Sequence, residues 1–401
     1  MFRRRLLIHL GLLVVLLPGM VSTVTAQTSD DLFAPHVLND VQLQVNTRDL
    51  AALREHWTEN TYYPADMTWH GQRIRNVAIR SRGTGSRNPV KLGLRIDFNR
   101  YVTGRQFLGL DALVLDNFWQ DPSMLRERTA MALFTRLGVP APREAFCRLF
   151  INGVFQGVYA LVEPIEAPFL QRTLGDSDGY LFEYEWLRNY YGEDLGGDLE
   201  AYAELFSAET HEDEPLSVLY DPIRDLIREA NGDNPALWRE RVDAYLDLPA
   251  FMTQAAVETF LADPDGLLGN WGMNNFYLHR GADSTRHRFL PWDKDVAFEL
   301  SDYPILHNAE TNIIFRRAFA EPDLRALFLD VLEQCARAAV EDAWLATEIE
   351  TAAALIAQAA HADPLKPTSN EEHDAGVDAL VDFAHLRPAF VVQEVEALRG
   401  R

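Results

Sequence analysis

The sequence predicts an α+β fold in which a β-rich first part, residues 27–163, is followed by a larger and mainly helical part, residues 164–401. Short alternating apolar runs separated by turn signals crowd the first part. Apolar residues at helical spacing fill most of the second part, apart from one hairpin at 263–299. With 401 residues, 47% of them hydrophobic, the chain is long enough to bury a large core.

The first part is predicted to alternate strands with two helices. Its clearest signal is the hairpin at 148–163, where Asn152-Gly153 is typical of a type I′ turn between alternating strands. Asp121 or Ser123 caps a helix predicted to end at Gly138. The predicted strands lie at 37–45, 69–80 (with a turn at 70–71) and 91–98, and the helices at 47–57 and 121–137.

The second part is predicted to hold a strand at 179–185 and many helices. Its acidic segment at 189–214 is interpreted as an insertion or an inter-lobe segment. The C-terminal third shows no chemical motif, so we interpret it as scaffold around the site. Helices are predicted at 165–174, 216–230, 234–246, 248–261, 311–320, 323–341, 343–362 and 376–398.

The N-terminus has the pattern of a secretory signal peptide at residues 1–26. Three arginines precede an apolar run at 6–17, and small residues lead to a cleavage position after Ala26. An uncleaved anchor is the alternative, although the run is short for a membrane span. We therefore expect a secreted or periplasmic, cell-envelope protein that begins at Gln27 and has no membrane span after cleavage.

Net charge and cysteine content limit the possible partners. The formal net charge of −23 disfavours binding to a nucleic acid polymer, which needs a basic surface, and is compatible with metal cations or basic proteins. Cys147 and Cys335 could pair in an exported protein or remain two free, buried thiols.

The hairpin at 263–299 gathers carboxylates and amides at one end. Asp263, Asp265 and Asn270 precede its first strand, 275–279, and Asp293 follows its second, 288–291. Such oxygen ligands suit Mg²⁺, Mn²⁺ or Ca²⁺. Kinases use a similar arrangement, in which an Asp is followed by an Asn and then by a second Asp beyond a hairpin. The alternative is a turn-rich hairpin without a ligand, because Asp and Asn are common turn residues.

A glycine-rich loop, SRGTGSR at 81–87, lies between two predicted strands. Its glycines, hydroxyls and arginines could wrap an anion, or the loop could be an ordinary mobile hairpin. Lys91 would open the next strand beside that anion. Glu127, in the first turn of the predicted helix, either serves the helix dipole or faces Lys91 and positions it.

Together these segments resemble the CotH kinase family, the spore coat protein H-like group of atypical protein kinases. The resemblance implies a kinase-like two-lobe fold, with a β-rich N-lobe and a mainly helical C-lobe. It also implies ATP and Mg²⁺ or Mn²⁺, with Ca²⁺ possible, between the lobes. It rests on RSRGTGSR, DPSMLRERTAMALFTRLGVPAP, INGVFQGVYALVEPIE, NNFYLHR and FLPWDKDVAFE, which span residues 80–299.

The resemblance also implies roles for individual residues. Lys91 would contact the nucleotide phosphates, Glu127 would pair with Lys91, and Glu163 would lie at the hinge near adenine. Asp265 would be the catalytic Asp, although its distance from Asn275 leaves Asp263 or Asn270 as alternatives. The metal would be held by Asn275 and Asp293. The phosphate-facing loop would comprise Arg82, Gly83, Thr84, Gly85, Ser86 and Arg87, which depart from the family pattern at Thr84-Gly85.

The function that this resemblance implies is an exported protein kinase that transfers the ATP γ-phosphate to Ser or Thr of secreted or envelope proteins. One alternative is a non-catalytic, kinase-fold protein for cation binding, assembly or adhesion. Another is a different nucleotide-dependent transfer, such as adenylylation. Convergence of Lys91, Asp265, Asn275 and Asp293 would favour an enzyme, and acids clustered without the lysine would favour a cation-binding module.

Overall fold

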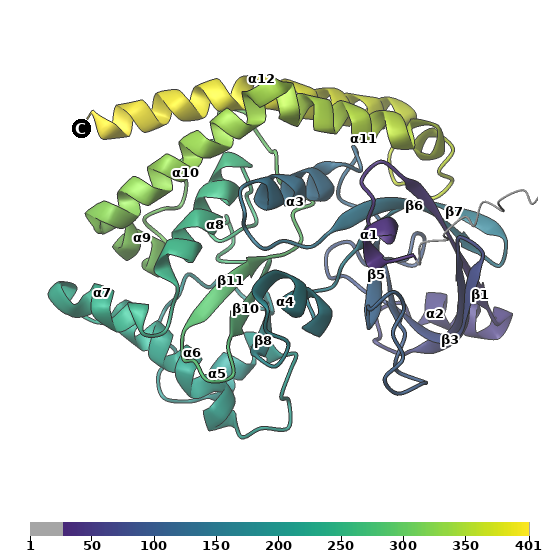
Figure 1. Ribbon diagram of the computed structural model, residues 1–401, viewed down its shortest axis with the longest axis horizontal. Coiled ribbons are helices and arrows are strands. Elements are labelled where there is room, and N and C mark those ends of the chain that lie inside the picture. The colour runs from purple at the N-terminus through teal and green to yellow at the C-terminus, as the bar shows by residue number, and fades with distance from the viewer. Residues whose placement is uncertain (1–26, 401) are drawn as a thin grey trace, which may run out of the picture.

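The computed structural model describes residues 27–400 and has a mixed α+β fold, as the sequence predicted (Figure 1). The predicted signal peptide lies outside the described residues. A β-barrel forms one end of the molecule, and a smaller sheet surrounded by helices forms the other. None of the described helices is long and apolar enough to cross a membrane.

Seven of the described strands close into a barrel in the order β1-β2-β3-β4-β5-β7-β6. Closure comes from parallel pairing of β1 with β6, in which Leu38 lies opposite Phe146. The inward side chains form one apolar cluster that includes Val41, Trp69 and Leu94. The strands are β1 (Leu38–Val45), β2 (Tyr63–Trp69), β3 (Gln72–Ser81), β4 (Leu94–Asp97), β5 (Ala112–Asp116), β6 (Glu144–Ile151) and β7 (Val154–Val162).

The turn between β6 and β7 forms where the sequence predicted it. Asn152 and Gly153 have φ angles of 51° and 79°, the left-handed values that a type I′ turn requires. The part of the chain that forms the barrel also contributes three helices: α1 (Ser29–Leu32), α2 (Thr47–Glu55) and α3 (Arg126–Arg136).

The other end of the molecule is built on a four-stranded antiparallel sheet in the order β11-β10-β8-β9. Its strands are β8 (Tyr180–Tyr184), β9 (Phe206–Ala208), β10 (Phe276–Arg280) and β11 (His287–Pro291). Figure 1 shows α11 and α12 running across the top of the view from this end to the barrel. The helices are α4 (Ala167–Leu174), α5 (Glu200–Ala203), α6 (Leu216–Asn231), α7 (Pro235–Asp243), α8 (Leu248–Phe260), α9 (Ile313–Ala320), α10 (Pro322–Val340), α11 (Trp344–His361) and α12 (Asn370–Arg399), with a 3₁₀ turn η1 (Glu341–Ala343).

Two predicted boundaries near the glycine-rich loop are wrong. Helix α3 begins at Arg126 rather than near residue 121, because the Asp121 carboxylate accepts the N–H groups of Ser123 and Arg126 and holds the intervening residues in a turn. Lys91 does not open a strand. The Asn88 side chain accepts the Lys91 N–H at 2.8 Å and keeps that residue in a turn ahead of β4.

The acidic segment at 189–214 is part of the packed fold of the helical end. It contributes β9, which pairs with β8, and it buries Tyr190, Tyr202 and Phe206 in the core of the helical end. Burial of these aromatic side chains outweighs the acidic composition that suggested an exposed segment.

Both cysteines are free thiols buried in different places. Cys147 lies in the barrel cluster, and Cys335 lies in the larger core of the helical end.

Candidate active site and cation site

The β10–β11 hairpin presents Asn275 and Asp293 at the same end. Phe276 pairs with Pro291, and the Trp292 N–H donates to the Asn275 carbonyl at 3.1 Å. Asn275 and Asp293 have φ angles of 56° and 49°. This left-handed region is costly for most residues and least so for Asn and Asp. The backbone therefore turns sharply at both positions where the sequence predicted metal ligands.

Asp265 is the catalytic-loop candidate that lies beside Asn275. Its carboxylate accepts the Nδ2 groups of Asn274 and Asn275 at 3.1 and 3.0 Å. Asp263 instead pairs with the Lys294 ammonium, and the Asn270 side chain accepts from His307 at 2.6 Å. Of the three alternatives, the geometry favours Asp265.

Lys294 is fully buried and neutralises two acids behind the hairpin. Its Nζ lies 3.2 Å from Glu258 Oε1 and 3.0 Å from Asp263 Oδ2. Burial alone would lower the pKa of Lys294, but these two carboxylates outweigh it and raise that pKa. The lysine is thus directed toward Glu258 and Asp263, and its flanking residues Asp293 and Asp295 are not its ion-pair partners.

Five acidic side chains from both ends of the molecule converge next to the hairpin. They come from the end of β5, the first turn of α3, the start of β6 and the segment after β11, and neighbours within the set help to raise the pKa of four of them. We call this set the acid cluster: Asp116, Glu127, Glu144, Asp293 and Asp295.

Burial and mutual repulsion raise the pKa of four members of the acid cluster, namely Glu127, Glu144, Asp293 and Asp295. Burial, followed by the charge of Asp116, raises the pKa of Asp293 to about 6. Burial and Glu144 raise the pKa of Glu127 well above its usual range. For Asp295 the causes are burial and Asp293, and for Glu144 burial outweighs the opposing effect of a nearby arginine. A bound cation would relieve this repulsion.

Glu144 provides the test of whether these residues fit a cation. The side chain is buried, and neither carboxylate oxygen has a hydrogen-bond partner among the described residues. A buried carboxylate without a donor is costly unless a positive charge approaches it. Glu144 and its acidic neighbours are therefore suited to a hard divalent cation such as Mg²⁺, Mn²⁺ or Ca²⁺.

Arg82 is the part of the glycine-rich loop that faces the acid cluster. Its Nη1 lies 3.8 Å from Asp116 Oδ2, and its guanidinium lies 5.6 Å from the centre of the Trp292 ring. Burial would lower the pKa of Arg82, but Asp116 and Asp293 outweigh it and raise that pKa. Arg82 therefore places a permanent positive charge beside Asp293.

The rest of the loop divides into an exposed tip and an anchor. Thr84 and Gly85 are exposed, and Gly83 takes a φ of 103° that favours glycine. Arg87 turns back and donates to the carbonyl of Ser81 at 3.0 Å. Its side chain therefore supports the loop instead of projecting from it.

Lys91 does not pair with Glu127. Its Nζ lies 2.7 Å from Asp363 Oδ2, both side chains are fully buried, and no ion pair joins Lys91 to Glu127 within residues 27–400. Glu127 belongs to the acid cluster instead. The expected pair is thus replaced, because the loop between α11 and α12 delivers a closer carboxylate to Lys91.

Gly157 makes the approach of Asp363 to the barrel possible. The Asp363 carboxylate accepts the Val158 N–H at 2.9 Å, and a Cβ at position 157 would overlap that carboxylate. Gly157 also has a φ of 122°, which other residues rarely adopt. Asp363 therefore enters a space that the absence of a side chain leaves open.

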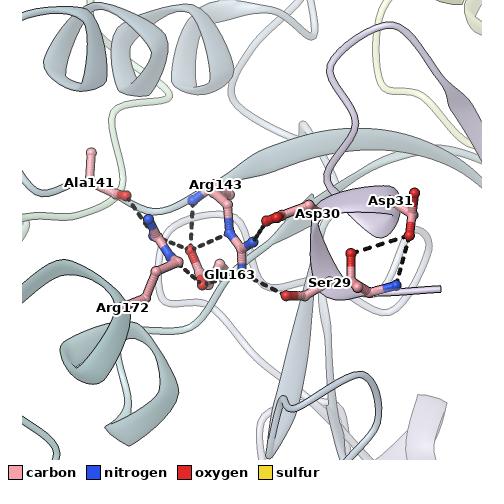
Figure 2. A network of polar contacts seen from close by, with 8 residues as sticks. Ser29, Asp30, Asp31, Ala141, Arg143, Glu163 and Arg172 are labelled. Carbon is pink, nitrogen blue, oxygen red and sulfur yellow. Dashed lines mark hydrogen bonds and ion pairs between the residues drawn. The ribbon is translucent and has the colours of Figure 1, made fainter. Parts of the chain in front are cut away.

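Glu163 holds together an ion-pair network (Figure 2). Its oxygens lie 2.7 Å from Arg143 Nη2 and 2.5 Å from Arg172 Nη2, and Arg143 also contacts Asp30 of α1. The Glu163 backbone N–H donates to the Arg143 carbonyl at 3.0 Å. Both its side chain and its N–H are thus engaged within the protein, which leaves no free donor there for a nucleotide base.

Comparison with known proteins shows the family of this chain. The family model described as CotH kinase protein matches residues 79–391. The chain belongs to this family. It is 22% identical to the inner spore coat protein H of Bacillus subtilis (strain 168) over 367 residues, which cover 89% of this chain and 97% of that protein. It is also 40% identical, over 55 residues, to the inner spore coat protein H-like protein of that organism, covering 14% of this chain and 18% of that protein.

In this CotH family chain, the structure brings together some of the predicted residues and pairs others with side chains that were not predicted. Asp265, Asn275, Asp293, Glu127 and Arg82 lie around one place. Two predicted residues have other side-chain partners: Lys91 pairs with Asp363, and Glu163 pairs with Arg143.

Three residues in or near the candidate site were not predicted from the sequence. Asp116 is the last residue of the buried strand β5, and Asp293 follows the end of β11 by two residues, so an acid at a strand end was a usable signal. Glu144 opens β6 without a motif of its own. Asp363 had no local signal, because its contact with Lys91 spans 272 residues.

Proposed function

We propose that this CotH family chain is an exported, divalent-metal-dependent kinase that transfers the γ-phosphate of ATP to Ser or Thr of secreted or envelope proteins. The barrel end, residues 27–163, is its small lobe, and residues 164–401 form its large lobe. The observation that carries the proposal is the convergence of Arg82, Asp265 and Asn275 with the acid cluster at one end of the β10–β11 hairpin.

The chemistry needs charge neutralisation and alignment more than a strong base. Asn275 and Asp293, supported by the acid cluster, would hold Mg²⁺ or Mn²⁺, which neutralises phosphate charge when bound. Arg82 takes over the phosphate-facing role expected of Lys91, because it faces Asp293 while Lys91 is bound to Asp363. Asp265, aligned by Asn274 and Asn275, would orient the acceptor hydroxyl.

The proposed location is the cell envelope or the spore. The Bacillus subtilis relative is named as an inner spore coat protein, and residues 1–26 of this chain have the pattern of an export signal. Both observations support a substrate protein that is itself exported.

The test is the variant Asp293→Asn, which keeps the side-chain shape and removes one charge. We expect an intact fold, no stabilisation by Mg²⁺–ATP in a melting curve, and at least ~100-fold slower transfer from γ-labelled ATP. The matched control is Asp283→Asn, which removes the same charge from the exposed turn at the opposite end of the same hairpin. Equal nucleotide responses in the two variants would remove Asp293 from the site and refute the kinase proposal.

A second candidate is a non-catalytic cation-binding protein for assembly or adhesion, which the sealed Lys91–Asp363 pair favours. Under that alternative, Ca²⁺ or Mg²⁺ stabilises the wild-type protein without ATP, and no label is transferred. Parallel assays with α-labelled and γ-labelled ATP separate both candidates from adenylylation, which transfers the α label.

A further inference from the structure

Two histidines and an aspartate meet where α11 ends and α12 begins. One ligand atom from each of His361, His373 and Asp374 lies within 4.8 Å of the others. His361 Nε2 already lies 2.7 Å from Asp374 Oδ1, and the two imidazole centres are 5.8 Å apart. These side chains lie outside the acid cluster and come from the C-terminal third of the chain, which was predicted to be scaffold.

His373 is held in the orientation of a metal ligand. Its ring is buried, and its Nδ1 lies 2.9 Å from the Pro122 carbonyl oxygen. A carbonyl can only accept, so Nδ1 carries the hydrogen and the neutral ring keeps its lone pair on Nε2. A backbone carbonyl that fixes the tautomer in this way is the usual partner of a metal-binding histidine.

We propose that His361, His373 and Asp374 form a binding site for a transition-metal ion of the Zn²⁺ class. Imidazole nitrogens with one carboxylate suit Zn²⁺ and its neighbours better than Mg²⁺ or Ca²⁺. Ligand atoms on a tetrahedral zinc ion lie about 3.3 Å apart, so the site contracts on binding. His361 and Asp374 are exposed and free to turn toward the buried His373. The fourth position is left to water.

The site lies on the loop that delivers Asp363 to Lys91. Asp363 follows His361 by two residues, and its carboxylate also accepts the N–H groups of Leu365 and Lys366 at 2.9 and 3.0 Å. A metal ion at the site would therefore join the two ends of this loop and hold Asp363 in the barrel.

The same ion would brace the turn that precedes α3. His373 bonds to Pro122, and Gly376 of α12 packs so closely on Ser123 that a Cβ there would lie 3.0 Å from the Ser123 nitrogen. Glu127 follows this turn on α3. The proposed ion is thus structural and lies outside the acid cluster.

The experiment uses the full chain after chelator treatment, with Zn²⁺ alone and Co²⁺ alone as probes. We expect one equivalent of Zn²⁺ to bind, Co²⁺ to give a visible absorption band, and hydrogen exchange in residues 361–374 to slow when Zn²⁺ is added. His361→Ala and Asp374→Asn should each weaken Zn²⁺ binding at least ~10-fold, the scale at which even outer-shell partners of a metal matter.

Two controls isolate the site. His56→Ala removes an exposed histidine that has one acidic partner, Glu59, at 3.1 Å, and it should leave Zn²⁺ affinity unchanged. Asp293→Asn should also leave it unchanged, so failure of the kinase proposal and failure of this one are distinguishable. The proposal is overturned if wild type binds Zn²⁺ no more tightly than His361→Ala and Asp374→Asn, or if His56→Ala weakens binding as much as they do.

Discussion

The positively charged side chains near the candidate site differ in whether they are available to bind a ligand. Lys91 has Asp363 as its partner at 2.7 Å, and Lys294 is shared between Glu258 and Asp263. Releasing either lysine would leave a buried carboxylate unpaired, which is strongly destabilising. Arg82 lies 3.8 Å from its nearest carboxylate, beyond hydrogen-bond distance, so its donors are available to a phosphate.

The Lys91–Asp363 pair should behave as a structural unit. Lys91→Met and Asp363→Asn should each lower the free energy of unfolding by about 3–5 kcal/mol, because each leaves one buried group without its partner. The double variant should cost less than the sum of the two. Urea unfolding of the four proteins measures this coupling.

An exposed pair provides the comparison. Arg73 and Asp66 are 2.7 Å apart with the arginine side chain 54% exposed, so Arg73→Met should cost less than about 1 kcal/mol. A Lys91→Met variant no less stable than Arg73→Met would contradict the structural role. A folded Lys91→Met that no longer responds to Mg²⁺–ATP would return Lys91 to the nucleotide site.

At the scale of elements, contacts between residues close in sequence could be predicted, and contacts between distant residues could not. The β6–β7 and β10–β11 hairpins were predictable because their turns and alternation are local, and the second hairpin also brings Asn275 next to Asp293. Closure of the barrel was not predictable, because β1 pairs with β6, which lies more than a hundred residues later in the chain. Asp363 was missed for the same reason, since nothing near it in the sequence indicates Lys91.

Strand β11 carries a histidine that should make the fold sensitive to acid. The His287 ring is fully buried, its Nδ1 lies 3.0 Å from the Tyr245 carbonyl oxygen, and its Nε2 has no partner within the described residues. Burial lowers the pKa of His287 to about 3, and the positive charge of nearby Arg280 adds to that effect. The unfolded chain has the ordinary pKa of about 6.5.

Because the folded-state pKa lies below the unfolded one, the contribution of His287 to stability is complete above pH 6.5 and is lost as the pH falls toward 3. The loss is at most about 1.4 kcal/mol per pH unit. Urea unfolding at pH 7, 5.5 and 4.5 should show a shallower acid loss for His287→Asn than for wild type. His211→Asn, which changes an exposed histidine, should keep the wild-type slope. Equal slopes in all three proteins would refute this assignment.

At the scale of the whole molecule, the candidate site requires both the barrel end and the helical end of the fold. Asp116, Glu127 and Glu144 belong to the barrel and the helix beside it, and Asp293 follows the hairpin of the other end. Buried ion pairs also cross between barrel-side elements and the C-terminal helices, including Arg128 with Glu348 at 2.7 Å. A cation in the acid cluster would therefore stabilise the contact between the two ends as well as bind a ligand.

The separation of the two thiols gives the last prediction. Cys147 and Cys335 are fully buried in different clusters, and burial raises the pKa of both thiols, which suppresses the reactive thiolate. The native protein should therefore show no reactive thiol. After the native protein is incubated under oxidising conditions and then unfolded, two reactive thiols should appear. A thiol-reactive dye with and without denaturant measures both numbers, and added reductant should leave the melting temperature unchanged. Fewer than two thiols in the denatured, unreduced protein would mean that a disulfide forms and that the packing of the barrel relative to α10 differs from the one described.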